Sequence, residues 1–483
     1  MRLPTVLELC GHRARAVTAA ALLAAGALVT VPAPAGATVT TITVSSAADA
    51  GPGTLRAALV DASSGGGSAG GDVVVEIPAG IGPIVLAGSL TYDGGSGGGH
   101  DLTVAGAGTV ITGNDTFGLL AVTTTGTTTL GGLALSRGSA TVGGAVATTG
   151  PLTVTDSTFT DNTSTNLGGA INSQSTLVIT DSTFTGNEST ADSGGGVWAT
   201  TSVEVTRSVF TGNVTATYGA AVISGGPVTA VDSVFDANVA PLAAGAIAGN
   251  GVLTAVRSTF TNHASYSGSA LYTGGEVVAI DSTFAGNSAT GYGSAIAALG
   301  GVTATNSTFV DNVSTNPGVA TIVTYGAAKI AYSTLTQAPT VDAGVLVAGS
   351  TIELFGSVLQ APGEAAVACS TNATSWGYNL VDDTSCGLAG TGDVQRAGID
   401  PLLGPLGDNG GPTPTRMPRP TSPLLGAIPN AACRTVPLAT AVVTDQRGAP
   451  RPTEPVGTCD VGAVQHDGPP PPEPAVPEPT FTG

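Results

Sequence analysis

Charged residues are scarce in this chain, and basic residues are the scarcer of the two signs. Charged residues make up 10% of the 483 residues, against about 25% in ordinary globular proteins. The 14 Lys and Arg face 33 Asp and Glu, which leaves a formal net charge of −19. A surface of this sign repels the phosphate backbone of nucleic acids and anionic lipid head groups. We therefore expect no nucleic-acid partner.

Apolar runs are short as well. An apolar stretch at residues 16–29 follows Arg2, Arg13 and Arg15 and leads into the small residues Ala-Gly-Ala at 35–37. This order is typical of a secretory signal, and the stretch is shorter than the roughly 20 residues of a spanning helix. We predict a signal peptide over residues 1–37, a secreted or cell-surface protein, and no transmembrane span once the signal is removed.

Cysteine is rare too, with 5 residues in the chain. Four of them follow the predicted signal peptide: Cys369, Cys386, Cys433 and Cys459. In an oxidising compartment an even number predicts disulfides, and four cysteines allow three pairings. We favour Cys369–Cys386 with Cys433–Cys459, because each of these bonds closes a local loop.

Small residues are abundant, with 71 Gly, and they are arranged in a repeat of about 25 residues. A phenylalanine marks each copy: Phe159, Phe184, Phe210, Phe235, Phe260, Phe284 and Phe309. A serine stands two residues before each of them. Three residues after the phenylalanine comes an asparagine in six copies, at Asn162, Asn187, Asn213, Asn238, Asn287 and Asn312, and His263 in the remaining one. Stacked copies of this position can form an amide ladder at a turn.

Each copy also contains a stretch with alternating apolar residues, such as Leu152 and Val154. This alternation predicts β-strands, and we expect three short strands per copy, separated by Gly and Asn turns. A single copy is too small to bury a core, whereas stacked copies pair in parallel at a spacing of about 4.8 Å. The predicted fold is an all-β, right-handed parallel β-helix of the pectate-lyase type. An α-solenoid would need a period of about 3.6 residues, and propeller blades run to about 40.

The repeat also predicts how the chain is divided. Residues 38–140 are expected to form an N-terminal cap, including a short amphipathic helix after Gly51, and irregular first rungs. Residues 141–365 form the regular repeats, and residues 366–467 a C-terminal segment with the disulfides. Residues 468–483 are Pro-rich and predict an extended tail.

Two stretches resemble known families. The GGA[IV] and FxxN motifs, cleanest at Gly168–Ile171 and Phe184–Asn187, resemble the polymorphic outer-membrane protein repeats of β-helical surface proteins. The runs that begin at Asp400, Thr444 and Cys459 are similar to the choice-of-anchor Q domain of secreted bacterial β-helix proteins. Both resemblances imply a surface or secreted role and neither implies a reaction.

The candidate catalytic residues all lie at one position of the repeat, three residues before each phenylalanine. Stacked copies of this position would form a column along the solenoid. It reads Asp156, Asp181, Arg207, Asp232, Arg257, Asp281 and Asn306. One rung would separate the first two carboxylates by about 4.8 Å, near the 5–5.5 Å of retaining glycosidases. The candidate catalytic residues are therefore Asp156, Asp181 and Arg207. The interpretation that we favour is a structural ion ladder, because opposite charges on neighbouring rungs attract.

The functional prediction is a non-catalytic, adhesin-like or envelope structural protein. The alternative is a polysaccharide lyase or glycoside hydrolase acting on the β-helix face. We expect no cofactor and no metal. The expected partner is a cell-surface or extracellular polysaccharide, or a host or neighbouring surface, and the oligomeric state is left open.

Overall fold

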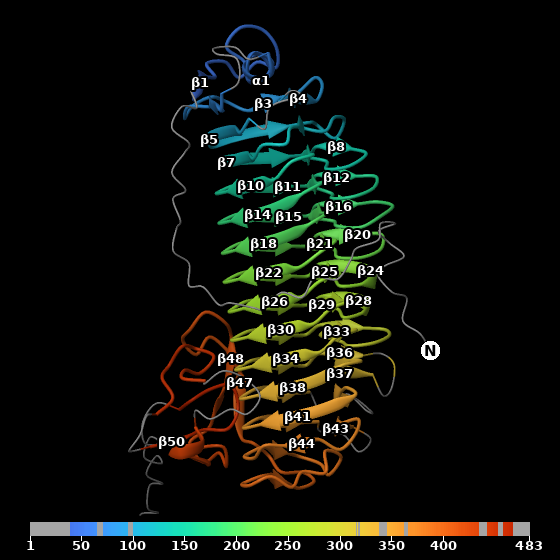
Figure 1. The fold of residues 1–483 in the computed structure, drawn as a ribbon, viewed down its shortest axis with the longest axis vertical. Helices are drawn as coiled ribbons and strands as arrows, with labels where there is room; N and C mark the ends of the chain where they lie inside the picture. Colours follow the sequence, from blue (N-terminus) through green and yellow to red (C-terminus); the bar gives the residue numbers. More distant parts are fainter. Residues whose placement is uncertain are drawn as a thin grey trace, which may run out of the picture. The chain divides into compact units, whose positions relative to one another are not determined.

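The computed structural model describes residues 39–64, 71–94, 100–314, 316, 319–337, 345–361, 366–433, 442–452 and 457–466. The predicted signal peptide and the Pro-rich tail lie outside these residues. The described chain is an all-β parallel β-solenoid with roughly 25 residues per turn, as predicted (Figure 1). No helix among the described residues is long and apolar enough to cross a membrane.

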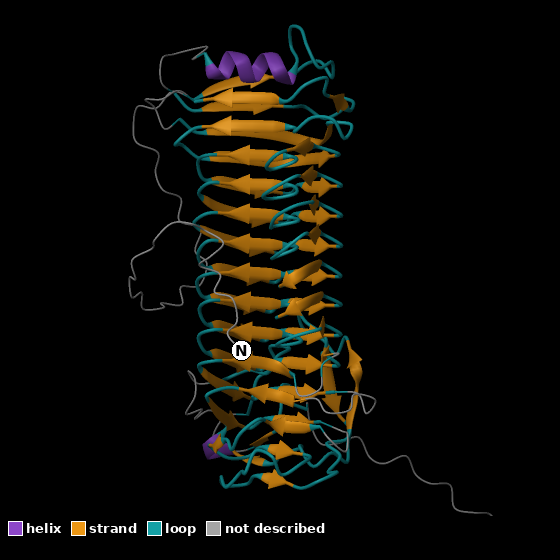
Figure 2. Cartoon of the chain, turned by 90° about the vertical axis from the view of Figure 1, so that its right-hand side faces the viewer, coloured by secondary structure: helices purple, strands orange, loops and turns teal. Residues whose placement is uncertain are grey.

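The first elements precede the regular repeat. They are β1 (Thr40–Thr43), α1 (Leu55–Ser63), β2 (Val73–Glu76), β3 (Ile84–Val85), β4 (Leu90–Asp93), β5 (Leu102–Thr112), β6 (Leu120–Thr123) and β7 (Thr128–Ser136). Helix α1 begins at Thr54, whose side chain accepts a hydrogen bond from the Ala57 N–H. Its apolar face, with Leu55 and Leu59 buried, lies over the end of the first strands (Figure 2). The helix thus covers strand edges and core that would otherwise face water.

Each regular repeat contains four strand segments. The first recurs as β10 (Leu152–Thr155), β14 (Thr176–Thr180), β18 (Ser202–Thr206), β22 (Val228–Val231), β26 (Leu253–Val256), β30 (Val277–Ile280), β34 (Val302–Thr305), β38 (Ala327–Ala331) and β41 (Thr351–Phe355). The second, which carries the phenylalanine, recurs as β11 (Thr158–Thr160), β15 (Thr183–Thr185), β19 (Val209–Thr211), β23 (Val234–Asp236), β27 (Thr259–Thr261), β31 (Thr283–Ala285), β35 (Thr308–Val310), β39 (Thr334–Thr336) and β42 (Val358–Gln360).

The third and fourth segments complete the turn. The third recurs as β8 (Ser139–Ala140), β12 (Thr163–Ser164), β16 (Glu188–Ser189), β20 (Val214–Thr215), β24 (Val239–Ala243), β28 (Ala264–Ser267), β32 (Ser288–Ala289) and β36 (Val313–Ser314). The fourth recurs as β9 (Val146–Thr148), β13 (Ile171–Ser173), β17 (Val197–Ala199), β21 (Val222–Ser224), β25 (Ile247–Gly249), β29 (Leu271–Thr273), β33 (Ile296–Ala298), β37 (Ala320–Thr324), β40 (Val345–Ala348) and β43 (Val367–Cys369).

The expectation of three strands per copy was one too few, and the reason lies at the corners. Asp156, with a φ of +46°, separates β10 from β11, and Asp161, with a φ of +52°, separates β11 from β12. Gly168, with a φ of +67°, precedes β13. A residue in the left-handed region breaks a strand, so β10 and β11 are separate segments although they belong to the same sheet.

The remaining elements follow the repeats. They are β44 (Thr374–Ser375), β45 (Leu380–Val381), β46 (Val394–Gln395), the antiparallel pair β47 (Leu403–Gly407) and β48 (Thr415–Pro418), β49 (Ile428–Pro429), the 3₁₀ helix η2 (Asn430–Ala432) and β50 (Thr458–Cys459), which pairs with β49.

The fold divides into two compact units. Unit 1 comprises Met1–Thr254, Phe260–Val277 and Ile296–Gly300, and unit 2 comprises Ala255–Thr259, Val278–Ala295 and Gly301–Gly483. In unit 1, Phe159 pairs in register with Phe184, and their rings stack with centroids 4.5 Å apart and planes within 1°. In unit 2, the rings of Phe284 and Phe309 stack at 4.7 Å. These rings are buried and form the centre of each core.

Buried amides hold the neighbouring rungs together. The Asn187 Oδ1 accepts hydrogen bonds from the backbone N–H and the Nδ2 of Asn162, at 3.1 and 2.9 Å. The Asn187 Nδ2 donates to the carbonyl of Phe159 at 3.0 Å. Each asparagine thus pairs with a backbone donor and a backbone acceptor of the preceding rung, which are otherwise unpaired at the corner.

The serine of the repeat also forms hydrogen bonds to the backbone of neighbouring rungs. The Ser182 Oγ accepts from the Ser157 N–H at 3.1 Å and donates to its own rung at the Thr180 carbonyl, 2.8 Å away. The left-handed corner residue diverts the backbone from the regular ladder, and the hydroxyl supplies the missing hydrogen bonds.

Candidate functional site

The column that begins with Asp156 lies at the left-handed corner between the first and second strand segments. In unit 1 its φ values are +46° at Asp156, +50° at Asp181, +46° at Arg207 and +51° at Asp232. The corner turns these side chains outward, whereas the serine that follows each of them is buried. The sequence signal, a charged residue before a serine, therefore marks a surface column.

Arg207 and Asp181 form a bidentate ion pair across neighbouring rungs. The Arg207 Nε donates to one carboxylate oxygen at 2.7 Å and Nη2 donates to the other at 2.6 Å. These hydrogen bonds hold the pKa of Asp181 below its ordinary value. Both side chains are largely solvent-exposed, so the pair contributes little to stability.

Asp181 in this arrangement is poorly suited to act as the general acid of a glycosidase. A retaining or inverting glycosidase needs one carboxyl that is protonated when the bond breaks. Asp181 instead stays ionised, because Arg207 stabilises its charge, and the same contact occupies the guanidinium. The geometry of Asp181 and Arg207 is that of an ion ladder.

Beside this column, the outward face of the second strand segments is exposed in unit 1. Thr158 on β11 is exposed, and Val209 on β19 and Val234 on β23 have exposed fractions of 37% and 40%. Thr158 pairs in register with Thr183 on β15, and Val209 with Val234. We call this surface the threonine–valine face and define it by Thr158, Thr183, Val209 and Val234.

The equivalent strand positions of unit 2 are buried. The threonines that head β31, β35 and β39, namely Thr283, Thr308 and Thr334, have exposed fractions of 0%, 0% and 2%. They are buried because parts of the C-terminal segment lie on them, with contacts from Pro414, Gln446 and Ala463. Figure 1 shows β47 and β48 of this segment beside the strands of unit 2.

Gln446 is the central contact of this covered face. Its Oε1 accepts from the Thr308 hydroxyl at 2.6 Å, and its Nε2 donates to the Thr283 Oγ1 at 2.8 Å and to the Thr413 Oγ1 at 2.9 Å. One side-chain amide thus bridges the threonine hydroxyls of two neighbouring rungs. The hydroxyls that the repeat presents outward can thus both donate to and accept from a side-chain amide.

Arg451 anchors the same segment from a fully buried position. Its guanidinium lies over the Tyr332 ring, 3.9 Å from the centroid, and donates to the Asn306 Oδ1 at 3.1 Å. It also donates to the backbone carbonyls of Asp460 at 3.2 Å and Gly462 at 2.9 Å. Asn306 and Tyr332 belong to the corner column, so the column that carries Asp156 in unit 1 holds the C-terminal segment in unit 2.

The covering segment also changes the electrostatics of Asp281 in that column. Burial raises the pKa of its carboxyl to about 6, against the lowering effect of a hydrogen bond from Asn306 at 3.1 Å. The pKa of Asp181, an exposed residue of the same column in unit 1, is lowered instead.

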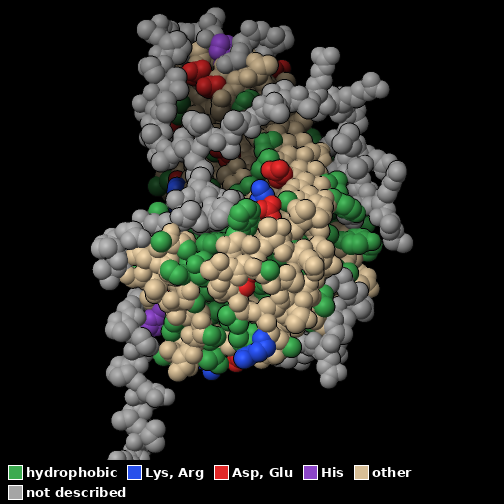
Figure 3. Space-filling view, turned by 60° about the horizontal axis from the view of Figure 1, so that its bottom comes forward, with side chains coloured by type: hydrophobic (Ala, Val, Ile, Leu, Met, Phe, Trp, Pro, Cys, Tyr) green, Lys and Arg blue, Asp and Glu red, His purple; other side chains and the backbone are tan. Residues whose placement is uncertain are grey.

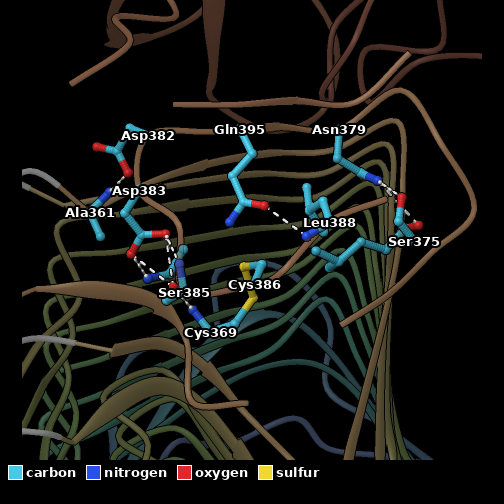
Figure 4. Close-up of a disulfide and its surroundings, with 12 residues drawn as sticks. Ala361, Cys369, Ser375, Asn379, Asp382, Asp383, Ser385, Cys386, Leu388 and Gln395 are labelled. Atoms are coloured by element: carbon cyan, nitrogen blue, oxygen red, sulfur yellow. Dashed lines mark hydrogen bonds between the residues drawn. A yellow bond between two sulfur atoms is a disulfide. The ribbon is translucent and has the colours of Figure 1, made fainter. Parts of the chain in front are cut away.

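The two disulfides join the cysteines in the pairing that we favoured. Cys369 is bonded to Cys386 and Cys433 to Cys459. Around the first bond, Asp383 accepts a hydrogen bond from the Ser385 hydroxyl at 2.8 Å (Figure 4). It also accepts from the Ala368 N–H at 2.8 Å. Tyr332 ties the second bond to the solenoid, because its hydroxyl donates to the carbonyl of Cys433 at 2.6 Å.

Two further features of the structure bear on ligand binding. A cavity of about 620 Å³ in unit 2 is lined by Thr421, Ser422, Thr458, Asp460 and Gln465, among others. The Asp460 carboxylate already accepts hydrogen bonds from the backbone of Gly426 and His466. Among the described residues, no group of three or more His, Cys, Asp and Glu side chains could hold a metal ion.

One stretch of the repeat matches a known family. The Chlamydia polymorphic membrane protein repeat matches residues 156–174. This stretch runs from the corner at Asp156 through β11 and β12 into β13. The match and the solenoid fit a repeat protein of the polymorphic membrane protein type. No curated protein matches the chain. The similarity of residues 400–464 to the choice-of-anchor Q domain stays a prediction.

Sequence reasoning missed the residues of the covered face. Gln446 stands in the run TDQRG, which enters the sequence analysis only as part of a resemblance, and Arg451 follows that run. Their contacts lie about 140 residues away in the chain, at Thr308 and Asn306. A local sequence pattern does not predict a contact between residues so far apart. An available signal was Tyr332, a bulky residue in a column of Asp, Asn and Arg.

Proposed function

We propose that this protein is a cell-surface β-helix protein with a non-catalytic, adhesin-like role. The observation that carries the proposal is the match of residues 156–174 to a polymorphic membrane protein repeat, together with the solenoid that the repeat builds. Surface proteins of this kind present long, regular faces to other surfaces.

The use of polar residues supports a binding role over a catalytic one. The serine and asparagine ladders donate and accept within the solenoid, and Asp181 and Arg207 pair with each other. Figure 3 displays a face with mostly uncharged side chains and a few scattered charges. A surface of this composition offers hydroxyl and aliphatic contacts over a wide area and few groups suited to proton transfer.

Limited protease treatment of intact cells, followed by mass spectrometry of the released peptides, tests the location. The proposal predicts that peptides from residues 143–312 are released before any cytoplasmic marker. Purified protein should also compete with the cells for attachment to the surface that they colonise. Peptides that appear only after lysis, or attachment unaffected by excess protein, would contradict the proposal.

A further inference from the structure

The corner column contains the same aspartate position in an exposed and in a covered form. Beside the threonine–valine face of unit 1, Asp156 and Asp181 are exposed. Asp281, which holds this position in unit 2, is half-buried. The backbone is alike in the two forms, with a φ of +50° at Asp181 and +51° at Asp281. The difference in burial therefore comes from what lies on the corner and not from the corner itself.

The C-terminal segment is what lies on Asp281. The Thr413 hydroxyl donates to the backbone carbonyl of Asp281 at 2.9 Å. The Asn306 Nδ2 donates to the Asp281 carboxylate at 3.1 Å and to the Thr444 carbonyl at 2.8 Å. One amide thus links the carboxylate to the segment, and the segment takes the place of water around the charge.

The groups that face Asp281 compensate only in part for the lost water. Burial raises the pKa of the carboxyl to about 6, and it outweighs the opposing hydrogen bond from Asn306. Arg257 on the preceding rung and Arg451 of the segment also favour the ionised form, whereas the negative charge of Asp445, in the segment, disfavours it. A buried carboxylate with one side-chain donor and a like charge nearby is more stable with a proton.

We propose that the junction between the C-terminal segment and the solenoid is a pH-sensitive clasp, which closes more firmly when Asp281 takes up a proton. The protonated carboxyl accepts the same hydrogen bond from Asn306 without the cost of a buried charge. When the segment lifts off, Asp281 becomes as exposed as Asp156 and Asp181 and binds its proton more weakly. The clasp does not depend on the proposed surface role.

The direction of the effect follows from linkage between proton binding and closure. The closed form holds the proton up to about pH 6, and the open form, with an ordinary aspartate, only up to about pH 3.9. The extra stability of the closed form is complete below the lower value and is lost as the pH rises through the upper one. The closed form should therefore be about tenfold more favoured at pH 5 than at pH 7.5.

Hydrogen exchange of the full chain at these two pH values tests the clasp. Protection factors, which remove the pH dependence of the intrinsic exchange rate, are measured for peptides covering residues 442–452. Asp281→Asn keeps an oxygen acceptor for Asn306 and removes the charge. The ratio of its protection factor to that of the unaltered protein should rise about tenfold from pH 5 to pH 7.5. Other titrating groups of the segment, such as Asp460, are common to both proteins and cancel in this ratio.

A matched control changes the exposed form of the same position. For Asp156→Asn the ratio should be equal at the two pH values, because the segment does not lie on this residue. A second measurement needs no variant: the carboxyl carbon of Asp281, assigned through its backbone in the unaltered protein, should titrate by NMR with a midpoint near pH 6.

Three results would overturn the clasp. They are a ratio for Asp281→Asn that stays constant or falls as the pH rises, an equal rise for Asp156→Asn, and a midpoint below pH 5 for the Asp281 carboxyl. If Asp281→Asn does not fold, the NMR midpoint decides between the two outcomes.

Discussion

The corner residues explain much of the repeat at the scale of single residues. Three positions per turn adopt left-handed φ, and glycine fills the second of them at Gly186, Gly212 and Gly286 and the third in several copies, as at Gly168 and Gly219. Elsewhere a non-glycine residue holds the conformation, at a cost of about 1–2 kcal/mol relative to the right-handed region. Ala237 is such a residue, with a φ of +51°.

Ala237→Gly should therefore stabilise the protein. Relief of the left-handed strain exceeds the entropy that glycine adds to the unfolded chain, so we expect a gain of about 0.5–1 kcal/mol. Denaturant unfolding measures it. The control is Ala121→Gly in strand β6, which should cost a similar amount. Equal destabilisation by both changes would contradict the assignment of Ala237 to a strained corner.

His263 makes the asparagine ladder sensitive to acid. It is fully buried and accepts at Nδ1 from the Asn238 N–H at 3.1 Å, and burial lowers its pKa from 6.5 to about 4. The unfolded chain binds the proton more readily than the folded one between these values. The contribution of neutral His263 to stability is thus complete above pH 6.5 and is lost as the pH falls toward 4.

His263→Asn should remove this dependence. Between pH 7.5 and pH 5 the unaltered protein should lose about 2 kcal/mol relative to the variant, from 1.36 kcal/mol per pKa unit. Asp281, whose raised pKa acts in the opposite direction, is present in both proteins and cancels in the difference. Unfolding curves at several pH values measure the effect, and a constant difference between the two proteins would contradict it.

At the scale of elements, the phenylalanine segments hold the core. Phe235 stacks between Phe210 and Phe260, at centroid distances of 5.1 and 4.9 Å, and is fully buried. Phe235→Ala should cost about 3–5 kcal/mol, the range for a large cavity in a packed core. An unchanged denaturation midpoint would rule out a central role for the stack.

Arg451 holds the C-terminal segment in place through its hydrogen bonds. Arg451→Met leaves the carbonyls of Asp460 and Gly462 and the Asn306 amide oxygen without this donor, at about 1–3 kcal/mol for each unpaired group. Hydrogen exchange should then rise in peptides covering residues 281–311 and stay unchanged in those covering 156–186. The exposed Arg396→Met is the control and should leave both regions unchanged.

How far the sequence predicts these elements depends on how far apart in the chain the contacting residues lie. Strand alternation and the spacing of Phe159, Phe184 and Phe210 predict the parallel solenoid, because each rung repeats the contacts of the last. The number of segments per turn was underestimated, because a left-handed Asp or Arg has no sequence signature as clear as that of glycine. The covered face was missed because its contacts join residues far apart in the chain.

At the scale of the whole molecule, the recurring serine and asparagine residues bond neighbouring rungs to each other, and Asp181 and Arg207 pair on the surface. The column of Asp156, Asp181 and Arg207 holds the candidate catalytic residues, since it brings carboxylates and a basic residue together on neighbouring rungs. Only Asp181 and Arg207 show a direct contact in this set, and it is a mutual ion pair.

The most direct test is an assay of the purified protein against a panel of polysaccharides, with detection of new reducing ends and of unsaturated products. The Asp156→Ala, Asp181→Ala protein is assayed beside it. The account predicts no cleavage by either protein and closely similar unfolding midpoints, because the exposed pair contributes little to stability. Cleavage by the unaltered protein that disappears in the double variant would contradict a non-catalytic role and place an active site on this column.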